Sequence, residues 1–360
     1  MGEVLLNETP IRTSKSFEIN NIKIDNFKIN NRFKAFKNIE TNNETIIDKN
    51  FVNGQNENNL TYGLNKDLEK QVNENSNVNI NLNLDKKKSD NYINYIFDDN
   101  NKELVDNISI ITNEGTSNNL IIDYSYDSKI KENKDLNFYH NGIIKINAKK
   151  DSSLNLVIVN LLNTASKNFM AIEANVEENA KINFTIVDFG GEYSISNLYT
   201  NLIGDNSKVN INTIYLGKDN QKIDLNYIIH QRGKKSIAKI DVQGALKDKS
   251  IKHFKGTIDF KKGCKGSKGS ENEECMLLSK EAKSIGYPVL LSSENDVEGS
   301  HSNSASRIGN KSLFYIMSRG FSKKETMVLM VKARFNKILE NIKDEELKEK
   351  ILKEIDNKIK

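Results

Sequence analysis

The sequence predicts a mainly β protein whose short strands stack into a solenoid, with a small helical lobe at the C-terminal end. Short segments of alternating apolar residues run from about residue 107 to residue 260. Equivalent positions in these segments recur at a nearly constant spacing, and residues 311–360 change to a helical period. A repeat of two or three strands cannot enclose a core alone, so each repeat has to stack on its neighbours.

Four strands define the period of this repeat. Their equivalent residues are Leu154, Ile182, Val209 and Ile237, which are spaced 28, 27 and 28 residues apart. A turn of small or polar residues precedes each strand, at residues 150–152, 178–180, 205–207 and 234–236. Second strands are expected between them, at residues 169–174, 196–203 and 223–229.

Two other β architectures fit these segments less well. No helical period separates the strands, which argues against a sheet built from βαβ units. An antiparallel sandwich would show more Asn-Gly or Asp-Gly hairpin turns than this sequence contains. We therefore expect a β-solenoid.

The N-terminal region differs from the repeats. Residues 1–100 are rich in Asn and poor in apolar side chains, and such a segment buries too little apolar surface to offset the ordering of its backbone. Two short strands are expected in it, for example at Val78–Leu84, where apolar residues alternate with Asn. The expected domains are a loosely ordered arm at 1–100, the solenoid core at 101–308 and the helical lobe at 309–360.

The helical lobe is marked by its start and stop signals. A first helix begins near Asn310 and ends at Gly320, Ser322 and Glu325 form a capping box for a second, and Asp344 can cap a third. Apolar residues of the second helix and the turn after it recur at helical spacing, at Met327, Val328, Val331, Phe335, Ile338, Leu339 and Ile342. Such a stripe packs as a core or offers a docking surface.

Composition excludes several classes of function. The 53 basic and 49 acidic residues nearly balance, so no overall field favours nucleic acid. Two cysteines, Cys264 and Cys275, make no disulfide framework, which favours a reducing, cytoplasmic compartment. The sequence contains neither a long apolar run for a membrane span nor the GxxxxGK[ST] pattern of a phosphate-binding loop. ATP, if it is used, must therefore be bound by a partner.

Residues 287–321 join the last expected strand to the first helix and carry a lone histidine, His301. Sites tend to form at such junctions. This stretch and its neighbours contain a recognisable pattern, made of Pro288, Asp296-Val297, His301, Ser306-Arg307-Ile308-Gly309, Leu313-Phe314-Tyr315 and Ser318-Arg319-Gly320. The pattern resembles the C-terminal signature of the SufB/SufD family of iron–sulfur cluster assembly proteins. Near the N-terminus, Pro10, Ile11, Arg12, Thr13 and Phe17 also resemble SufD-type chains.

The resemblance implies a right-handed parallel β-helix with a helical C-terminal lobe, and it leaves the branch of the family open. SufB-type chains carry a cysteine near the final rungs where sulfur arrives or the cluster nucleates, and the equivalent position here is Glu273. Cys275 follows two residues later, which returns to the same face of a strand. The histidine without that cysteine favours a SufD-like chain, whereas the spacing from His301 to Gly309 resembles SufB.

The resemblance also implies a function. The chain would be a non-catalytic scaffold that pairs through its last rungs with a SufB-type chain or with itself, and that binds a SufC-type ATPase through its lobe. An iron–sulfur cluster would be carried only transiently. His301 is the first candidate ligand and Cys275 the second, with Cys264 and Glu273 after them. Docking of the ATPase is expected at Leu313, Phe314, Tyr315, Arg319, Gly320, Phe321, Val328 and Phe335.

Two other classes of function remain open. A polysaccharide-active solenoid enzyme would need carboxylates with Arg or Lys on one face, usually with Ca²⁺, and no such cluster is visible in the sequence. A purely structural interaction protein would tolerate the loss of His301 and Cys275.

Overall fold

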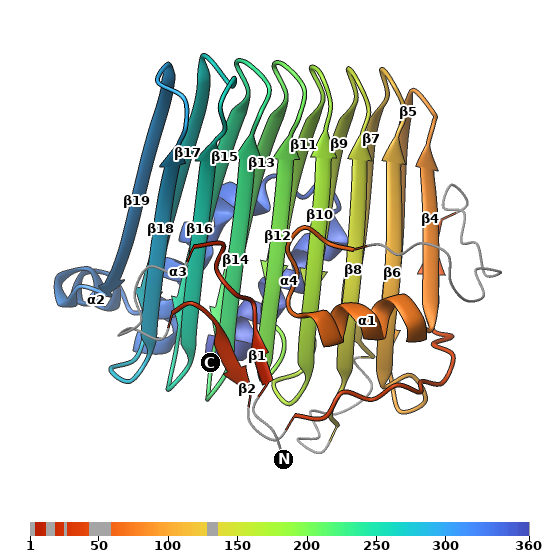
Figure 1. Ribbon diagram of the computed structural model, residues 1–360. Coiled ribbons are helices and arrows are strands. Elements are labelled where there is room, and N and C mark those ends of the chain that lie inside the picture. The colour runs from red at the N-terminus through yellow and green to blue at the C-terminus, as the bar shows by residue number, and fades with distance from the viewer. Residues whose placement is uncertain (1–3, 12–18, 25–26, 43–58, 128–135, 360) are drawn as a thin grey trace.

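Two parallel sheets wind around a shared interior in the computed structural model, which describes residues 4–11, 19–24, 27–42, 59–127 and 136–359 (Figure 1). The even-numbered sheet contains β4 (Val78–Leu84), β6 (Glu103–Thr112), β8 (Tyr139–Ala148), β10 (Lys167–Val176), β12 (Tyr193–Leu202), β14 (Lys222–Gln231), β16 (Ile251–Phe260) and β18 (Lys283–Ser292). The odd-numbered sheet contains β3 (Ile39–Thr41), β5 (Lys88–Phe97), β7 (Ser117–Tyr126), β9 (Ser153–Asn160), β11 (Lys181–Asp188), β13 (Lys208–Gly217), β15 (Ile237–Leu246), β17 (Ser267–Leu277) and β19 (Val297–Arg307).

From β4 onward, consecutive strands alternate between the two sheets, so each rung gives one strand to each sheet. Neighbouring strands are parallel, except that β3 runs antiparallel to β5. This arrangement confirms the predicted β-solenoid. The expected strand at Val78–Leu84 is β4, and the second strands of the repeat are β10, β12 and β14.

The register confirms most of the predicted repeat and corrects one position. Leu154, Ile182 and Val209 are direct neighbours on adjacent strands. The next neighbour of Val209 is Ala238 rather than Ile237, so the last spacing is 29 residues instead of 28. Ala238 is buried and Ile237 is only half-buried, because successive residues of a strand face opposite sides.

The predicted turns share one backbone conformation. Asp151, Asn179, Asn206 and Lys235 each have φ between 54° and 58°. Asn and Asp adopt this left-handed conformation more readily than other residues with a Cβ, because their short polar side chains can bond locally. A small buried residue follows in every case, namely Ser152, Ala180, Ser207 and Ser236. The polar and small residues of the repeat therefore reverse the chain at each rung.

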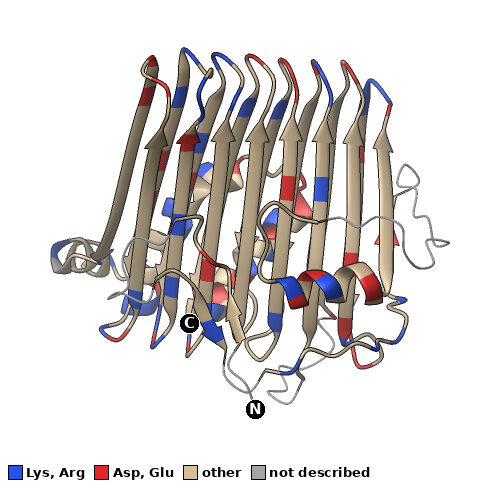
Figure 2. Cartoon of the chain, viewed as in Figure 1, with Lys and Arg blue, Asp and Glu red and all other residues tan. Residues whose placement is uncertain are grey.

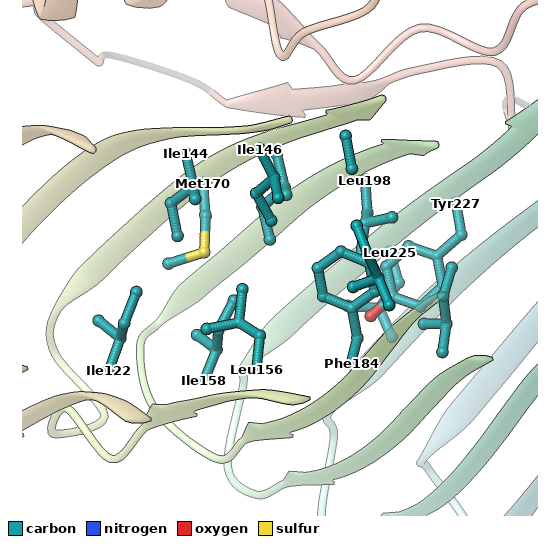
Figure 3. Close-up of a cluster of buried hydrophobic side chains, with 14 of the residues drawn as sticks. Ile122, Ile144, Ile146, Leu156, Ile158, Met170, Phe184, Leu198, Leu225 and Tyr227 are labelled. Atoms are coloured by element: carbon teal, nitrogen blue, oxygen red, sulfur yellow. The ribbon is translucent and has the colours of Figure 1, made fainter. Parts of the chain in front are cut away.

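Apolar side chains from both sheets fill the interior (Figure 3). Ile144, Ile146, Met170, Leu198, Leu225 and Tyr227 come from the even-numbered sheet, and Ile122, Leu156, Ile158 and Phe184 from the odd-numbered sheet. The interior is thus one continuous core rather than a series of separate ones.

A ladder of asparagines lies on the outer face of the odd-numbered sheet. The side chain of Asn155 donates to Asn119 at 2.8 Å, Asn183 donates to Asn155 at 2.7 Å, and Asn210 donates to Asn183 at 2.7 Å. Equal residues at equal register can bond in this way only when the strands are parallel and in line. Part of the asparagine content therefore stabilises the stack.

The N-terminal region covers the outer face of the even-numbered sheet. There β1 (Val4–Leu6) pairs with β2 (Ile22–Ile24), and α1 (Lys66–Asn75) lies across the strands in Figure 1. Asn7 anchors this region, because its amide donates to Asp224 at 2.6 Å, and Lys255 pairs with the same carboxylate at 2.7 Å. Arg12, Thr13 and Phe17 lie outside the described residues. Since β4 and β5 precede residue 101, the solenoid sheets start within 1–100, and the division into three domains stays a prediction.

The helical lobe covers the outer face of the odd-numbered sheet. It consists of α2 (Asn310–Met317), α3 (Lys323–Leu339) and α4 (Glu345–Ile359), and α3 and α4 lie behind the solenoid in Figure 1. The predicted capping box of Ser322 and Glu325 is present, and Asp344 accepts from the backbone of Leu347 at 2.9 Å. The apolar stripe of α3 packs with outward-facing apolar residues of β9, β11 and β13. The stripe is therefore mainly a core.

Ion pairs and a hydrogen bond tie the lobe to strands far apart in the solenoid. Lys350 pairs with Asp123 on β7 at 2.6 Å, Lys337 pairs with Asp241 on β15 at 2.9 Å, and Arg334 pairs with Glu274 on β17 at 2.6 Å. Lys358 donates to Gln221, next to β14, at 3.2 Å. The lobe thus spans the stack from β7 to β17.

Charged residues of both signs lie at the turns of the solenoid, while most of each strand is uncharged (Figure 2). This distribution agrees with the near balance of charge in the sequence. Among the helices of the described ranges, none combines the length and the apolar character that a membrane span requires.

Replacing Phe184 by Ala tests the continuous core. Phe184 is fully buried between the sheets, so Phe184→Ala should lower the free energy of unfolding by about 3–5 kcal/mol in a urea titration. The matched control is Phe314→Ala, because Phe314 is 75% exposed and its loss should change stability by less than about 0.5 kcal/mol. Equal effects of the two variants would contradict a core shared by both sheets.

Candidate functional site

The last rung of the solenoid, formed by β18 and β19, is uncovered. No residue of β18 or β19 is buried, whereas the strands before them are mostly buried. β18 and β19 are the terminal strands of their sheets, so one edge of each lacks a neighbouring strand among the described residues. We call this surface the terminal rung. Unpaired strand edges are ready to pair with another chain.

His301 lies on β19 and is exposed. Its side chain is on the face of β19 that is turned toward the interior of the solenoid. His301 is the register partner of Glu271 on β17. Its orientation follows from Asn303, two residues later on the same strand, whose amide donates to the buried Glu273 at 2.6 Å. Residues i and i+2 of a strand share a face, so His301 lies on the side of Glu271 and Glu273.

Glu273 is fully buried and has three partners. Lys252 on β16, itself fully buried, forms an ion pair with it, Tyr215 donates to it at 3.0 Å, and Asn303 donates to it from the terminal rung. Burial raises the pKa of Tyr215, so its phenol stays protonated and remains a donor. A buried carboxylate is tolerable when it is paired and hydrogen-bonded in this way.

Glycines make room for the polar side chains that cross the interior. A Cβ on Gly244 would overlap the ring of Tyr215, and a Cβ on Gly286 would overlap the amide of Asn303. The same holds for Gly256 and the carboxyl group of Glu271. Gly286 and Gly256 lie where a polar residue reaches across from the other sheet, whereas Gly244 and Tyr215 are neighbours within the odd-numbered sheet.

Cys275 is buried on the same face of β17 as Glu273, as the sequence predicted, but it does not meet His301. Burial raises the pKa of its thiol, which disfavours the nucleophilic thiolate, and Tyr215 and Ser284 lie beside it. Its neighbour on β19 is Ala305, four residues from His301 and thus about 13 Å along the strand. His301 and Cys275 cannot bind the same metal ion in this arrangement, because about 13 Å of strand separates them.

Cys264 is buried in the turn between β16 and β17, at the opposite end of β17 from Cys275. Burial raises the pKa of its thiol too. The two cysteines are therefore roughly 25 Å apart along the strand. In the described part of the chain, no three His, Cys, Asp or Glu side chains converge closely enough to hold a metal ion.

Glu271 is the residue that sequence reasoning missed. Its side chain is 2% exposed, and neither carboxyl oxygen has a hydrogen-bond partner among the residues that the structure describes. Burial, and then the negative charge of Glu273, raise the pKa of Glu271 to about 8. The alternation that joins Glu273 to Cys275 also places Glu271 on their face, so the signal was present in the sequence. The sequence could not show that Lys252 forms an ion pair with Glu273 and not with Glu271.

The expected docking residues divide into two groups. Phe314, Tyr315 and Phe321 are exposed, by 75%, 57% and 43%, and Arg319 stacks over the ring of Tyr315 at 4.4 Å. Gly320 is also exposed, and Leu313 is half-exposed. Val328 and Phe335, by contrast, are buried in the core between α3 and the odd-numbered sheet. These two belong to the packing of the lobe, so they are not accessible to a partner.

Exposed apolar side chains gather at this end of the lobe. Among the described residues, five of the nine large apolar side chains that are exposed lie between residues 314 and 329. They are Phe314, Tyr315, Met317, Phe321 and Leu329, and we call them the α2 patch. Contiguous exposed apolar residues of this kind mark contact surfaces.

The raised pKa of Glu271 predicts a specific pH dependence of stability. The folded protein keeps a proton on Glu271 that the unfolded chain loses above its ordinary pKa of 4.5. The free energy of unfolding should therefore fall as pH rises from about 4.5 to about 8, by a few kcal/mol at most, since one pKa unit is worth about 1.4 kcal/mol. Glu271→Gln keeps a neutral side chain and should remove this loss.

The measurement is urea denaturation at pH 5.5 and pH 8.5. We expect wild type and Glu271→Gln to be similar at pH 5.5, and the variant to be the more stable at pH 8.5. Glu281→Gln, in an exposed turn, is the control and should follow the wild type at both values. If Glu271→Gln lost as much stability as the wild type between pH 5.5 and pH 8.5, Glu271 would not carry the proton in the folded protein.

The known proteins reported below as similar to this chain are described as iron–sulfur cluster assembly proteins. The model of the family "SUF system FeS cluster assembly, SufBD core domain" matches residues 95–334. The iron–sulfur cluster assembly protein SufD of Bacillus subtilis is 28% identical over 167 residues, which cover 46% of this chain and 38% of that protein. A SufBD family iron–sulfur cluster assembly protein of Pyrococcus horikoshii is 31% identical over 170 residues, 47% of this chain and 37% of that protein.

The SufD protein of Escherichia coli is 26% identical over 171 residues, which cover 47% of this chain and 40% of that protein. Each match thus spans less than half of the relative's length. The two SufD relatives agree with the SufD-like branch that the lone histidine favoured. Because the family model covers more than half of the residues, the chain belongs to the SufBD family of SUF-system iron–sulfur cluster assembly proteins.

Proposed function

We propose that the chain is a non-catalytic scaffold subunit of a SUF-type assembly complex in the cytoplasm. It pairs through the terminal rung with a SufB-type chain or with a second copy, and it binds a SufC-type ATPase through the α2 patch. The iron–sulfur cluster is cargo, assembled transiently at the paired rungs. His301 is the ligand that this chain offers there, while Cys275 and Glu273 lie behind it in the interior.

The uncovered terminal rung is the observation that carries this proposal. A solenoid that stood alone would gain stability by capping its last rung, because unpaired edges and a half-open core invite association. Here β18 and β19 stay uncovered, although the helical lobe packs on the strands before them. A second solenoid end would continue both sheets and enclose the side chains of the rung. Membership of the SufBD family supplies the context of iron and sulfide.

The α2 patch supports the second contact. Phe314 and Tyr315 are exposed on α2, the helix that follows β19 directly, and Phe321 is exposed in the turn before α3 (Figure 1). Arg319 and Tyr315 add a cation over an aromatic ring, and side chains of these types dominate the energetics of protein contacts. The sequence has no phosphate-binding loop, so the ATPase activity of such a complex must be supplied by another chain.

The pairing can be tested with Ala305→Lys. Ala305 is exposed on β19 and faces the same side as Cys275, so a lysine there would be buried without a partner in a paired rung. We expect the association constant to fall by more than about tenfold in sedimentation experiments. Asn295→Lys, in the exposed turn before β19, is the control and should pair normally. If Ala305→Lys associates as strongly as the wild type, the terminal rung is not the pairing surface.

Docking of the ATPase can be tested with Phe314→Ala. Loss of one exposed aromatic anchor should weaken binding of the purified ATPase by about 2 kcal/mol, roughly thirtyfold, without lowering the melting temperature. Ile203→Ala is the control, because Ile203 is an exposed apolar residue on a distant turn. If the chain recovered from its native cell carries no ATPase with a phosphate-binding loop, the proposed complex is wrong.

A further inference from the structure

We propose that the two turns at residues 232–236 and 261–266 form a docking surface for a partner protein that presents a short run of Asp and Glu. We call these two segments the basic turns. They connect β14 to β15 and β16 to β17, and they lie on adjacent rungs, because the backbone N–H of Lys235 donates to the carbonyl of Lys265 at 2.9 Å. This contact goes beyond the two contacts of the proposed function and does not rest on them.

The basic turns concentrate positive charge. They contain no acidic residue and six basic ones, namely Arg232, Lys234, Lys235, Lys261, Lys262 and Lys265. The rest of the chain has 47 basic and 49 acidic residues, so without these turns its net charge would be −2. Five of the six side chains are exposed, and only Lys261 is half-buried.

Another pair of adjacent turns, at the same end of the solenoid, has balanced charges. Lys149 pairs with Glu177 at 2.8 Å and Lys150 pairs with Glu178 at 3.0 Å, so opposite charges stack from one rung to the next. In the basic turns, like charges stack instead. Like charges on neighbouring strands destabilise a sheet, so this arrangement does not stabilise the fold.

The carboxylates on the neighbouring turns bind backbone groups of the basic turns. Asp205, on the preceding turn, accepts from the backbone N–H of Lys234 at 2.8 Å. Glu294, on the following turn, accepts from the backbone N–H of Gly263 at 3.1 Å. These two carboxylates therefore order the turns without pairing with their ammonium groups.

Four of the six cations have no acidic partner. Lys261 pairs with Asp259 on the preceding strand, and Lys265 lies 3.9 Å from Asp296. The side chain of Arg232 donates to the amide oxygen of Asn201 at 2.9 Å. Among the residues that the structure describes, no carboxylate pairs with the side chains of Arg232, Lys234, Lys235 and Lys262. Their charges are thus available to an anion from outside the chain.

The size and the borders of the surface favour a protein over a nucleic acid. Adjacent rungs are about 4.8 Å apart, so the surface is only a few side chains wide. Asp205 and Glu294 lie on either side of it and would repel a phosphate backbone that continued beyond this width. A short run of Asp and Glu fits between them, and its charge complementarity would speed association.

The basic turns are separate from the α2 patch. α2 follows the C-terminal end of β19, whereas the basic turns precede β15 and β17 and lie at the opposite end of the strands in Figure 1. β17 has 11 residues, which corresponds to about 35 Å of strand. An acidic partner could therefore bind while the α2 patch is occupied.

Binding of a fluorescein-labelled octaglutamate peptide to the full chain tests the surface. Fluorescence anisotropy is measured at moderate ionic strength, where charges more than about 10 Å apart are largely screened. We expect the double variant Lys235→Gln/Lys262→Gln to bind the peptide about fivefold more weakly than the wild type. Its melting temperature should not fall, because the substitutions remove repulsion between like charges.

The matched control is Lys149→Gln/Lys150→Gln. It changes the net charge by the same amount at the same end of the solenoid, but its lysines are already paired with Glu177 and Glu178. This control should bind octaglutamate as the wild type does. Weaker binding by the folded Lys235→Gln/Lys262→Gln variant alone supports the docking surface.

Three results would overturn the inference. The first is a wild-type chain that does not bind octaglutamate, and the second is equal affinity of the wild type and Lys235→Gln/Lys262→Gln. The third is tighter binding of a short DNA duplex or of phosphatidylserine vesicles than of the peptide, which would assign the surface to a nucleic acid or a membrane. None of these results bears on pairing of the terminal rung or on recovery of the ATPase, so the proposed function stands or falls by its own tests.

Discussion

The rest of the structure depends on one constraint, the register that stacks each residue on its equivalent in the next rung. Parallel pairing in register places like side chains above one another in both sheets, as the asparagine ladder demonstrates. The same register makes one continuous core from apolar residues that are far apart in sequence. A stack of this kind must also end, and the backbone N–H and C=O groups at the outer edge of its last rung have no neighbouring strand to pair with.

The candidate site follows from that ending. Lys252, Glu273 and Glu271 lie in the rungs next to the end, where a fully apolar interior would be exposed at an open face. The carboxyl group of Glu271 fits because Gly256 on the facing strand leaves a gap for it, and Glu273 is paired with Lys252. Buried polar groups also occur in the middle of the interior, where His140 pairs with Asp106 and Ser194 donates to Asp188. At the open end such groups lie next to a surface that meets water.

Local patterns in the sequence were enough for the strands, the turns and the helix caps, because each of these depends on residues close in sequence. They failed at Ile237, where one extra residue between rungs shifts the register to Ala238. They also failed at Glu271, whose importance depends on Gly256 and Lys252 across the interior. Helical spacing could not decide whether Phe335 is core or contact surface, because the sheet that covers it comes from a distant part of the chain.

The attachment of the lobe to β7, β15 and β17 has a mechanical consequence. A pull on α3 is divided among anchors on several rungs, so it loads many strand contacts at once and does not peel the stack one strand at a time. Parallel strands loaded together resist sliding through all of their hydrogen bonds. A force on the lobe would therefore displace the solenoid as one rigid body.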